Sequence, residues 1–552
     1  MKQMINEMSY FLKNKLYIIM VSFVAIFSYG FTVTHPAIGI DDTAIPLYFE
    51  DGFAACAGRW VLYIINKVLF LADFIPWMTE VVSVIIFVLS VTLWCVLLRR
   101  IVGERVPIWG YAIFSSLFIS CPLISEVFVY YLHNGICIGY GVTALSLLGV
   151  LEAVKKGNSL KKTIGYAMVS ASALCIAIGL YESFIIVFII GMFMIFFLIR
   201  LQKEDKDCFY AYDAVKWIGV IIVAVIGALV LRTFIVKIIT FVFQLEIPAD
   251  VRGYEYRGIF NDLQRPLYDT FMILKKFVVM YYLNAFCYLP ITVYVISICV
   301  LLLVGICLCF KKKDIFLFLA MLAIPIVPVL VPILEGYPTH YRASQYVPLI
   351  GAFAVFVLML FSTQNKYSLL WKRIVIIASM IIVWNQCIDM NKWFYVDYLK
   401  YEDAKQVMNT IMYDLEREHD VTKPIVFRGG YLVPYEIAKE AYLDFDSNTY
   451  QVMSAIADVI DPHLLEKFNA EDQKGYVFTQ TPINSTLRWG ITAFDNTSGQ
   501  LKEFWAMHGH SIEIVVDQEV IEEAEQLRND MPAFPREGYI KEQEDYIIVN
   551  LY

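Results

Sequence analysis

The chain has 552 residues, of which 59% are hydrophobic and 17% are charged, and its mean hydropathy is +0.61. Soluble domains carry about 25% charged residues, so this composition excludes an ordinary soluble protein and indicates a membrane protein. The net charge of −8 is uneven, because residues 391–552 hold 14 Lys and Arg against 29 Asp and Glu and the rest of the chain is basic. No nucleic-acid partner is expected from this balance.

Apolar runs of about 20 residues, the length that a helix needs to cross a bilayer, recur along the chain. They begin near Tyr17, Met78, Pro107, Ile136, Thr163, Ser183, Val215, Pro290, Ile315, Tyr346 and Ile374. The first run ends in Thr34-His35-Pro36 without a small-residue cleavage site, so a secretory signal is not expected. The sequence therefore predicts an α-helical polytopic membrane protein with about eleven transmembrane helices.

Lys and Arg lie between these runs on one predicted side. They are Lys2, Lys13, Lys15, Arg99, Arg100, Arg105, Lys155, Lys156, Lys161, Lys162, Lys203, Lys206, Lys311, Lys312, Lys313, Lys372 and Arg373. Because such residues accumulate on the cytoplasmic side of a membrane, the N-terminus is expected inside. We expect a multi-pass protein of the plasma membrane with its C-terminal domain outside the cytoplasm.

Three outer segments have an unusual sequence. Residues 35–77 form a long first loop, in which residues 58–71 have the pattern of an amphipathic interfacial helix. Residues 244–289 carry basic side chains among aromatics, against the charge rule, and an anionic ligand would explain them. The third segment, residues 335–344, reads Glu-Gly-Tyr-Pro-Thr-His-Tyr-Arg-Ala-Ser.

The acidic tail, residues 391–552, predicts a small soluble α/β domain that follows a membrane domain at residues 1–390. The tail contains no Cys, so it has no disulfide of its own. The pattern predicts helices at 401–418, 498–508 and 519–529, strands at 423–429 and 511–516, and a terminal hairpin at 538–551.

Two adjacent carboxylates, Asp41 and Asp42, follow the first span. At a membrane–water boundary they would repel each other and raise one pKa, which suits a general base acting on a hydroxyl. The alternative is a solvated acidic turn without chemistry. A divalent metal near the pair stays open, although the chain has no Cys-x-x-Cys pair and no His-Glu-x-x-His motif that would support zinc. No other cofactor is indicated.

The stretch His-Pro-Ala-Ile-Gly-Ile-Asp-Asp at 35–42 and the Ala-Gly-Arg-Trp at 57–60 resemble the glucosyltransferase GtrII family of bacterial surface-polysaccharide enzymes. Three further segments are also similar: Pro-Thr-His-Tyr-Arg-Ala at 338–343, Lys-Pro-Ile-Val-Phe-Arg-Gly at 423–429 and Pro-Arg-Glu-Gly-Tyr-Ile at 535–540. The resemblance implies a GT-C fold, a polyprenyl-phosphate-linked sugar donor and transfer to a glycan at the outer face. It also implies catalytic acidic residues in the first outer loop, to which Asp41 and Asp42 correspond.

A lipid phosphate at headgroup level needs cationic partners, and Arg binds phosphate in a bidentate manner. Arg59 and Arg342 lie at the ends of apolar runs and are the leading candidates for binding the donor phosphate. Less favoured candidates are Arg252, Arg257, Lys275 and Lys276. The alternative for each is contact with ordinary lipid headgroups.

Polar residues in the outer loops are the candidate substrate ligands. They are Glu126, His133, Tyr181, Glu182, His340 and Tyr341. Ionisable residues at membrane depth are costly and by default suggest a function, such as binding a sugar hydroxyl or orienting an Arg. The alternatives are structural pairing inside the bundle for the two Glu residues and a polar cap for His340.

The expected activity is transfer of a hexose, glucose by the resemblance, from the lipid-phosphate donor to a cell-surface polysaccharide. Asp41 is favoured as the base and Asp42 as the residue that holds the loop or the acceptor. A polysaccharide polymerase and a lipid-linked glycan flippase or transporter remain alternatives. Transporters place charges near the bilayer midplane, whereas here they gather at one face, which favours the transferase.

Overall fold

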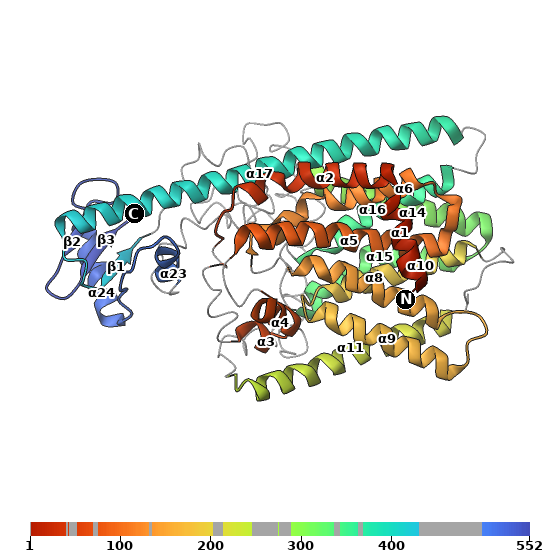
Figure 1. Ribbon diagram of the computed structural model, residues 1–552, viewed down its shortest axis with the longest axis horizontal. Coiled ribbons are helices and arrows are strands. Elements are labelled where there is room, and N and C mark those ends of the chain that lie inside the picture. The colour runs from red at the N-terminus through yellow and green to blue at the C-terminus, as the bar shows by residue number, and fades with distance from the viewer. Residues whose placement is uncertain are drawn as a thin grey trace. The chain divides into compact units, whose positions relative to one another are not determined.

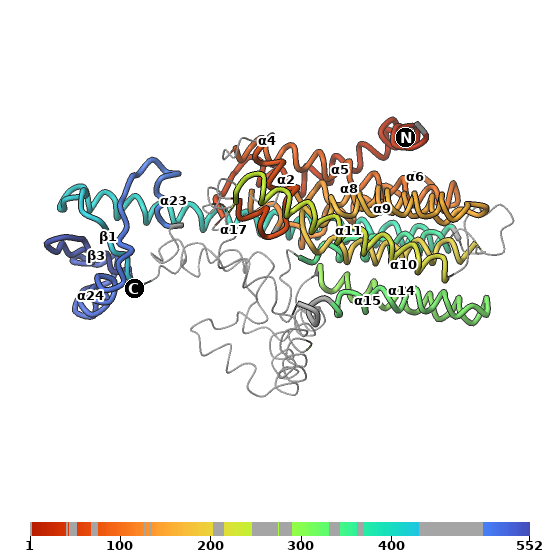
Figure 2. The backbone as a smooth tube through the Cα atoms, turned by 90° about the horizontal axis from the view of Figure 1, so that it is seen from below, coloured from red at the N-terminus to blue at the C-terminus, as the bar shows by residue number. Residues whose placement is uncertain are grey.

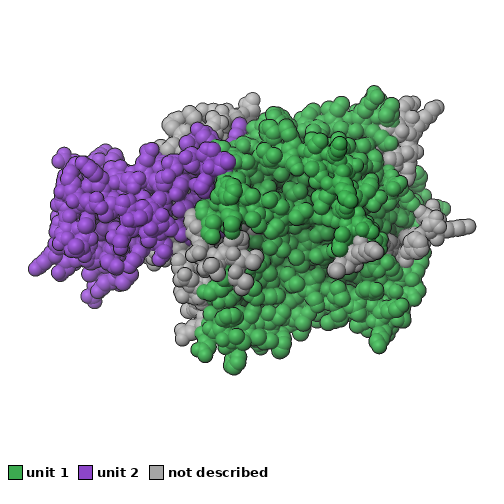
Figure 3. Space-filling view, in the orientation of Figure 1, with its two compact units in different colours: residues 1–33, 47–127, 133–391 green, residues 34–46, 128–132, 392–552 purple. Residues whose placement is uncertain are grey.

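The computed structural model (Figures 1 and 2) describes residues 2–39, 42, 52–69, 75–131, 135–202, 214–245, 274, 289–335, 343–362, 368–429 and 500–551. The chain divides into two compact units, which Figure 3 shows in different colours. Unit 1 comprises residues 1–33, 47–127 and 133–391, and unit 2 comprises residues 34–46, 128–132 and 392–552.

Unit 1 is helical. Its helices up to the tenth are α1 (Lys2–Lys13), α2 (Lys15–Thr34), α3 (Phe53–Cys56), α4 (Trp60–Leu69), α5 (Pro76–Val102), α6 (Ile108–Ile119), α7 (Ser125–Phe128), α8 (Ile136–Ala153), α9 (Leu160–Ile178) and α10 (Phe184–Leu201). They are followed by α11 (Ala214–Val242), α14 (Leu289–Lys312), α15 (Ile315–Glu335), α16 (Tyr346–Ser362) and α17 (Ser368–Glu418). Short 3-10 turns at Gly103–Arg105 and Pro122–Ile124 flank α6.

A helix lies at each of the eleven predicted spans. Seven of the described helices are long and apolar enough to cross a membrane, and α6, α15 and α16 contain shorter apolar stretches. The helix α6 is short because Pro122 lacks the N–H that a helix interior needs, so the chain turns there. The polytopic helical class is confirmed, whereas the number of eleven crossings stays a prediction.

Seven helices of unit 1 form a closed ring of packed neighbours: α5, α8, α10, α15, α14, α16 and α6, which packs back on α5. The helix α9 packs on α8, and α11 packs on α9. Phe87, Phe118 and Tyr140 meet where α5, α6 and α8 join, with ring centroids between 5.2 and 6.0 Å apart. This apolar core fixes the positions of α5, α6 and α8 relative to one another, and therefore the positions of the turns at their ends.

The helix α17 is one continuous helix of 51 residues, where the sequence predicted a span and a separate helix at 401–418. No Gly or Pro occurs between Ser368 and Glu418, so nothing in the sequence interrupts the backbone hydrogen bonds. Its residues up to Asn391 belong to unit 1, and those from Lys392 onwards belong to unit 2.

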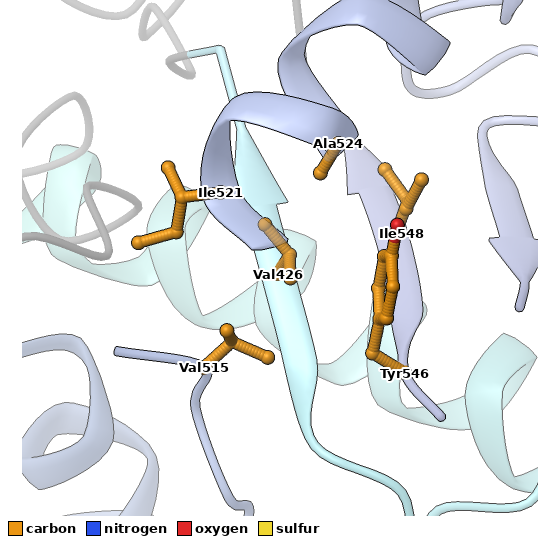
Figure 4. Close-up of a cluster of buried hydrophobic side chains, with 6 residues drawn as sticks. All are labelled: Val426, Val515, Ile521, Ala524, Tyr546 and Ile548. Carbon is orange, nitrogen blue, oxygen red and sulfur yellow. The ribbon is translucent and has the colours of Figure 1, made fainter. Parts of the chain in front are cut away.

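Unit 2 contains a three-stranded sheet of order β1-β3-β2, from β1 (Ile425–Arg428), β2 (Ile540–Glu542) and β3 (Ile547–Asn550). The strand β1 runs parallel to β3, and β2 and β3 form the expected antiparallel hairpin. One face is covered by α24 (Gln518–Leu527), and Figure 4 shows the apolar cluster formed there. It contains Val426, Val515, Ile521, Ala524, Tyr546 and Ile548. Phe427 points to the other face and meets Trp505 of α23 (Gln500–Met507), with ring centroids 5.6 Å apart.

The helices predicted at 498–508 and 519–529 are thus confirmed as α23 and α24, whereas the strand predicted at 511–516 forms a single bridge. Its Ile514 pairs with Ile425, and the two hydrogen bonds around that pair measure 2.8 and 3.1 Å. Pairing stops there because Asp517 already caps α24, accepting from the Glu519 N–H.

Polar side chains join the hairpin of unit 2 to the end of α17 and to the segment between α17 and β1. Lys423 Nζ donates to Glu542 Oε1 at 2.7 Å, and Tyr539 Oη donates to Asp414 Oδ2 at 2.8 Å. Hydrogen bonds from Lys423 and His419 hold the pKa of the Glu542 carboxyl below its usual range. These contacts fix the hairpin against the helix at neutral pH.

Candidate functional site

The segment Gly58-Arg59-Trp60 follows α3 and is positioned by the backbone of that helix. The Gly58 N–H donates to the Ala55 carbonyl at 3.0 Å, and the Arg59 N–H donates to the Ala54 carbonyl at 2.8 Å. This pair of bonds is the Schellman arrangement that ends a helix, and Gly58 supplies the left-handed residue with a φ of 85°. Arg59 is therefore held at a defined place between α3 and α4.

The turn between α9 and α10, residues 179–183, packs on the start of α4. The Val61 N–H donates to the Gly179 carbonyl at 2.9 Å. A Cβ on Gly179 would lie 2.4 Å from the Trp60 indole nitrogen, so the absence of a side chain allows the turn to approach the ring. The turn thereby brings its polar residues next to the Gly58-Arg59 segment.

Two of those polar residues contact Arg59. Its Nε lies 3.5 Å from Glu182 Oε2, and its guanidinium carbon lies 4.5 Å from the centroid of the Tyr181 ring. Arg59, Tyr181 and Glu182, three residues singled out from the sequence, are thus brought together by the structure.

Arg232 reaches the same carboxylate from α11. Its Nη2 donates to Glu182 Oε1 at 2.8 Å and to the Ala57 carbonyl at 3.3 Å, and its Nε donates to the Gly58 carbonyl at 3.3 Å. A Cβ on Gly58 would lie only 1.8 Å from Arg232 Nη2. Glycine at position 58 is therefore needed both for the backbone turn and for the space that the guanidinium occupies.

Arg59, Glu182 and Arg232 are called the cationic cluster below. Their side chains are 22%, 38% and 25% exposed, so the cluster is partly shielded from water. The two guanidinium groups contact the two oxygens of one carboxylate, so the cluster gathers two cations at one place. Guanidinium groups brought together in this way could bind an anionic ligand.

The 179–183 turn also contacts the start of α16. The Ser183 hydroxyl donates to Gln345 Oε1, and the Tyr140 hydroxyl donates to the Gln345 carbonyl at 3.2 Å. Gln345 lies two residues beyond the 338–343 segment, whose Arg342 is the second predicted phosphate ligand. The turn therefore links the cationic cluster with the end of that segment.

The Gly39-to-Asp42 turn belongs to unit 2. The Gly39 N–H donates to Asp42 Oδ2 at 2.9 Å, and the Asp42 N–H donates to the Gly39 carbonyl at 3.0 Å. A Cβ on Gly39 would lie 2.5 Å from the Tyr130 ring, so glycine permits the close approach of that ring. The Asp42 carboxylate is buried and holds its own loop.

Several predicted site residues lie outside the described residues: Asp41, His133, Arg342, His340, Tyr341, Arg252, Arg257, Lys275 and Lys276. Glu126 lies in the short helix α7, and its side chain is likewise not described. Within the described ranges, no group of three or more His, Cys, Asp or Glu side chains could hold a metal ion. The sequence left a divalent metal near Asp41 and Asp42 open, and the described residues do not test it.

Arg232 and Glu80 are among the buried or half-buried charged residues that the sequence reasoning missed. Arg232 was counted as part of an apolar run, although a lone Arg within a predicted span is itself a signal of function. Glu80, only 1% exposed near the start of α5, accepts a hydrogen bond from the Thr32 hydroxyl at 3.0 Å. The rule that an ionisable residue within a predicted span suggests a function would also have singled out Glu80.

The long apolar helices place the chain in the class of multi-pass membrane proteins. Residues 30–360, more than half of the chain, match the family model described as glucosyl transferase GtrII, so the chain belongs to this family. The match confirms the resemblance found at 35–42 and 57–60, and it supports a glucosyltransferase role. The similar segments at 423–429 and 535–540 lie outside the matched range. No curated protein and no solved structure matches the chain.

Proposed function

We propose that this protein transfers glucose from a polyprenyl-phosphate-linked donor to a cell-surface polysaccharide at the outer face of the plasma membrane. The observation that supports the donor is the cationic cluster, in which Arg59 and Arg232 share the Glu182 carboxylate. Two guanidinium groups gathered at one place suit a phosphate, because guanidinium groups bind phosphate oxygens in a bidentate manner.

Glu182 is a positioning residue in this proposal. A single carboxylate contacts both guanidinium groups, at 2.8 and 3.5 Å, and keeps two mutually repelling cations close together. It thereby fixes the orientation in which Arg59 and Arg232 meet the phosphate. Arg342 would add a third cation from the segment that follows α15.

Asp41 is the proposed base. Asp42 supports this assignment, because its carboxylate is already engaged by the backbone N–H of Gly39. In the reaction the acceptor hydroxyl gives its proton to Asp41, and its oxygen forms a bond to the anomeric carbon of the donor. The bond between that carbon and the phosphate oxygen breaks, and polyprenyl phosphate leaves with the electron pair.

The test uses purified full-length protein in nanodiscs with a synthetic short-chain polyprenyl-phosphate glucose. Glycan from a strain that lacks the gene serves as the acceptor. We expect label to move into the glycan from this donor, no transfer from nucleotide-linked glucose, and no transfer by Asp41→Asn. Movement of the donor across the bilayer without transfer would instead establish a flippase, and growth of the chain by whole repeat units would establish a polymerase.

The proposed side of the membrane has its own test. A periplasm-active phosphatase fused after the C-terminal residue is expected to be active, because the basic connections predict a cytoplasmic N-terminus and an odd number of spans. Activity of a cytoplasm-specific reporter at that position would overturn the orientation.

A further inference from the structure

The first helix, α1, differs in direction from the helices that follow it. Figure 1 shows it running across the direction of α2, α5 and α6, and Figure 2 shows it close to end-on while those helices are seen along their length. The spanning helices run from one side of the membrane to the other. A helix that runs across them lies along the membrane surface, where amphipathic helices bind.

The side chains of α1 fall on three faces that suit this position. The inner face holds Phe11, which is fully buried against Tyr17 and Tyr111 with ring centroids 5.1 and 5.4 Å apart. A second face exposes Ile5 and Leu12, seven residues apart, with exposed fractions of 55% and 38%. Apolar side chains so exposed are stabilised by contact with the acyl chains of a lipid.

The third face is polar and borders a surface hollow of about 460 Å³. The hollow is lined by Asn6, Ser9, Tyr10, Lys13 and Asn14, and the first four recur at helical spacing. Its lining offers amide and hydroxyl groups and one ammonium group, all of which donate hydrogen bonds to a phosphate. None of these five side chains is acidic.

Two arginines at the end of α5 contact α1, and each also pairs with a carboxylate, Arg99 with Glu104 at 3.6 Å and Arg100 with Glu7. The Arg99 guanidinium carbon lies 3.8 Å from the centroid of the Tyr10 ring, which forms part of the lining. Arg100 holds α1 in place through its Nε, which lies 2.6 Å from Glu7 Oε2. A hollow whose lining includes amide, hydroxyl and ammonium donors, next to a face that suits acyl chains, matches both parts of an anionic phospholipid.

We infer that α1 binds an anionic phospholipid, with the phosphate headgroup in the hollow at Lys13 and the acyl chains along Ile5 and Leu12. The proposal is independent of the sugar-transfer activity. The lipid anchors the N-terminal helix to the membrane surface at the end of unit 1 where α5 ends.

The experiment measures thermal unfolding of the full chain in detergent while phosphatidylglycerol or phosphatidylcholine is added. Phosphatidylglycerol is expected to raise the unfolding temperature of the wild type more than phosphatidylcholine does. Lys13→Gln removes the ammonium group, and the concentration of phosphatidylglycerol for half-maximal stabilisation should rise about tenfold. Lys161→Gln, an exposed lysine on α9, removes an equal charge outside the hollow and should respond as the wild type does.

Equal responses of the wild type and Lys13→Gln to phosphatidylglycerol would overturn the site. The same stabilisation by inorganic phosphate alone, or by phosphatidylcholine, would overturn its assignment to an anionic lipid. Native mass spectrometry adds a second measurement, in which the wild type retains bound phosphatidylglycerol and Lys13→Gln loses it.

Discussion

The two ends of unit 1 balance their charges differently. At the end where α8 meets α9 and α14 meets α15, three cations each have a carboxylate partner at 2.6 Å. The pairs are Arg100–Glu7, Lys155–Glu152 and Arg200–Asp314, and this end is called the paired end. At the opposite end, Arg59 and Arg232 share one carboxylate.

Under the proposed function, the charges of the paired end stabilise the fold, whereas those of the cationic cluster bind the donor. Arg100–Glu7 and Arg200–Asp314 join one helix to another segment, and Lys155–Glu152 is a local pair, so each of these three cations has a partner within the protein. The cationic cluster joins the Gly58-Arg59 segment, the 179–183 turn and α11, and its two guanidinium groups contact the same carboxylate. Loss of a charge should therefore affect stability at the paired end and donor use at the cluster.

The largest expected effect lies at the paired end, at Arg200 and Asp314, whose side chains are only 10% and 8% exposed. Asp314→Ala leaves Arg200 without this partner and should destabilise the protein by about 3–5 kcal/mol. Thermal unfolding in detergent measures the loss. The double change Arg200→Met with Asp314→Leu should regain much of it, and if it is as unstable as Asp314→Ala, the unpaired charge is not the cause.

The next effect concerns the cluster. Arg232→Ala should lower sugar transfer at limiting donor by about 10- to 150-fold, because a hydrogen bond to a charged group contributes about 1.5–3 kcal/mol. Its unfolding temperature should change much less than that of Asp314→Ala. Lys237→Ala removes an exposed cation from the same helix and serves as the control. Equal activity of Arg232→Ala and Lys237→Ala would mean that the cluster does not bind the donor.

A smaller effect is expected from Gly58→Ala. The left-handed backbone costs an alanine roughly 1–2 kcal/mol, and the added Cβ displaces the Arg232 guanidinium. We expect transfer to fall by roughly 5- to 30-fold. Gly157→Ala has a similar φ, 77°, but nothing within 4 Å of its Cβ, so it tests backbone strain alone. Activity that falls equally in both variants would argue against the displacement of Arg232.

The smallest effect is expected at the exposed part of the paired end. Lys155 and Glu152 are 38% and 28% exposed and form an i,i+3 pair on one turn. Lys155→Gln should change the stability by less than about 1 kcal/mol, because water screens such pairs, and should leave transfer unchanged. A drop in transfer without a drop in stability would show that the paired end also serves the reaction.

Much of the fold was readable from the sequence because it depends on local pattern. Apolar runs predicted a helix at each of eleven places, and turn residues predicted the hairpin of β2 and β3. The continuity of α17 was also readable, since no Gly or Pro interrupts it, but the change from an apolar to a charged pattern suggested two elements. The helix α1, which runs across the direction of the spanning helices, was not predicted, because its twelve residues are too few for a transmembrane span.

The candidate site was only partly readable. Arg59, Tyr181 and Glu182 could be singled out because each is a polar residue at the edge of an apolar run. Their pairing with Arg232 could not, because Arg232 lies 50 residues from Glu182 and 174 from Gly58. Contacts over such separations depend on which helices pack together, and the apolar pattern of one helix does not specify its neighbours.

The sequence by itself determined the membrane class, the positions of the helices and the family resemblance, because composition and period act within a single segment. It also determined that residue 58 is a glycine next to an arginine. Only the tertiary structure shows why residue 58 must be a glycine. Because α11 packs beside α9, Arg232 occupies the space that a side chain at position 58 would fill. In the same position Arg232 shares the Glu182 carboxylate with Arg59. That meeting of three segments makes one carboxylate contact two guanidinium groups, an arrangement that exists only in the folded chain.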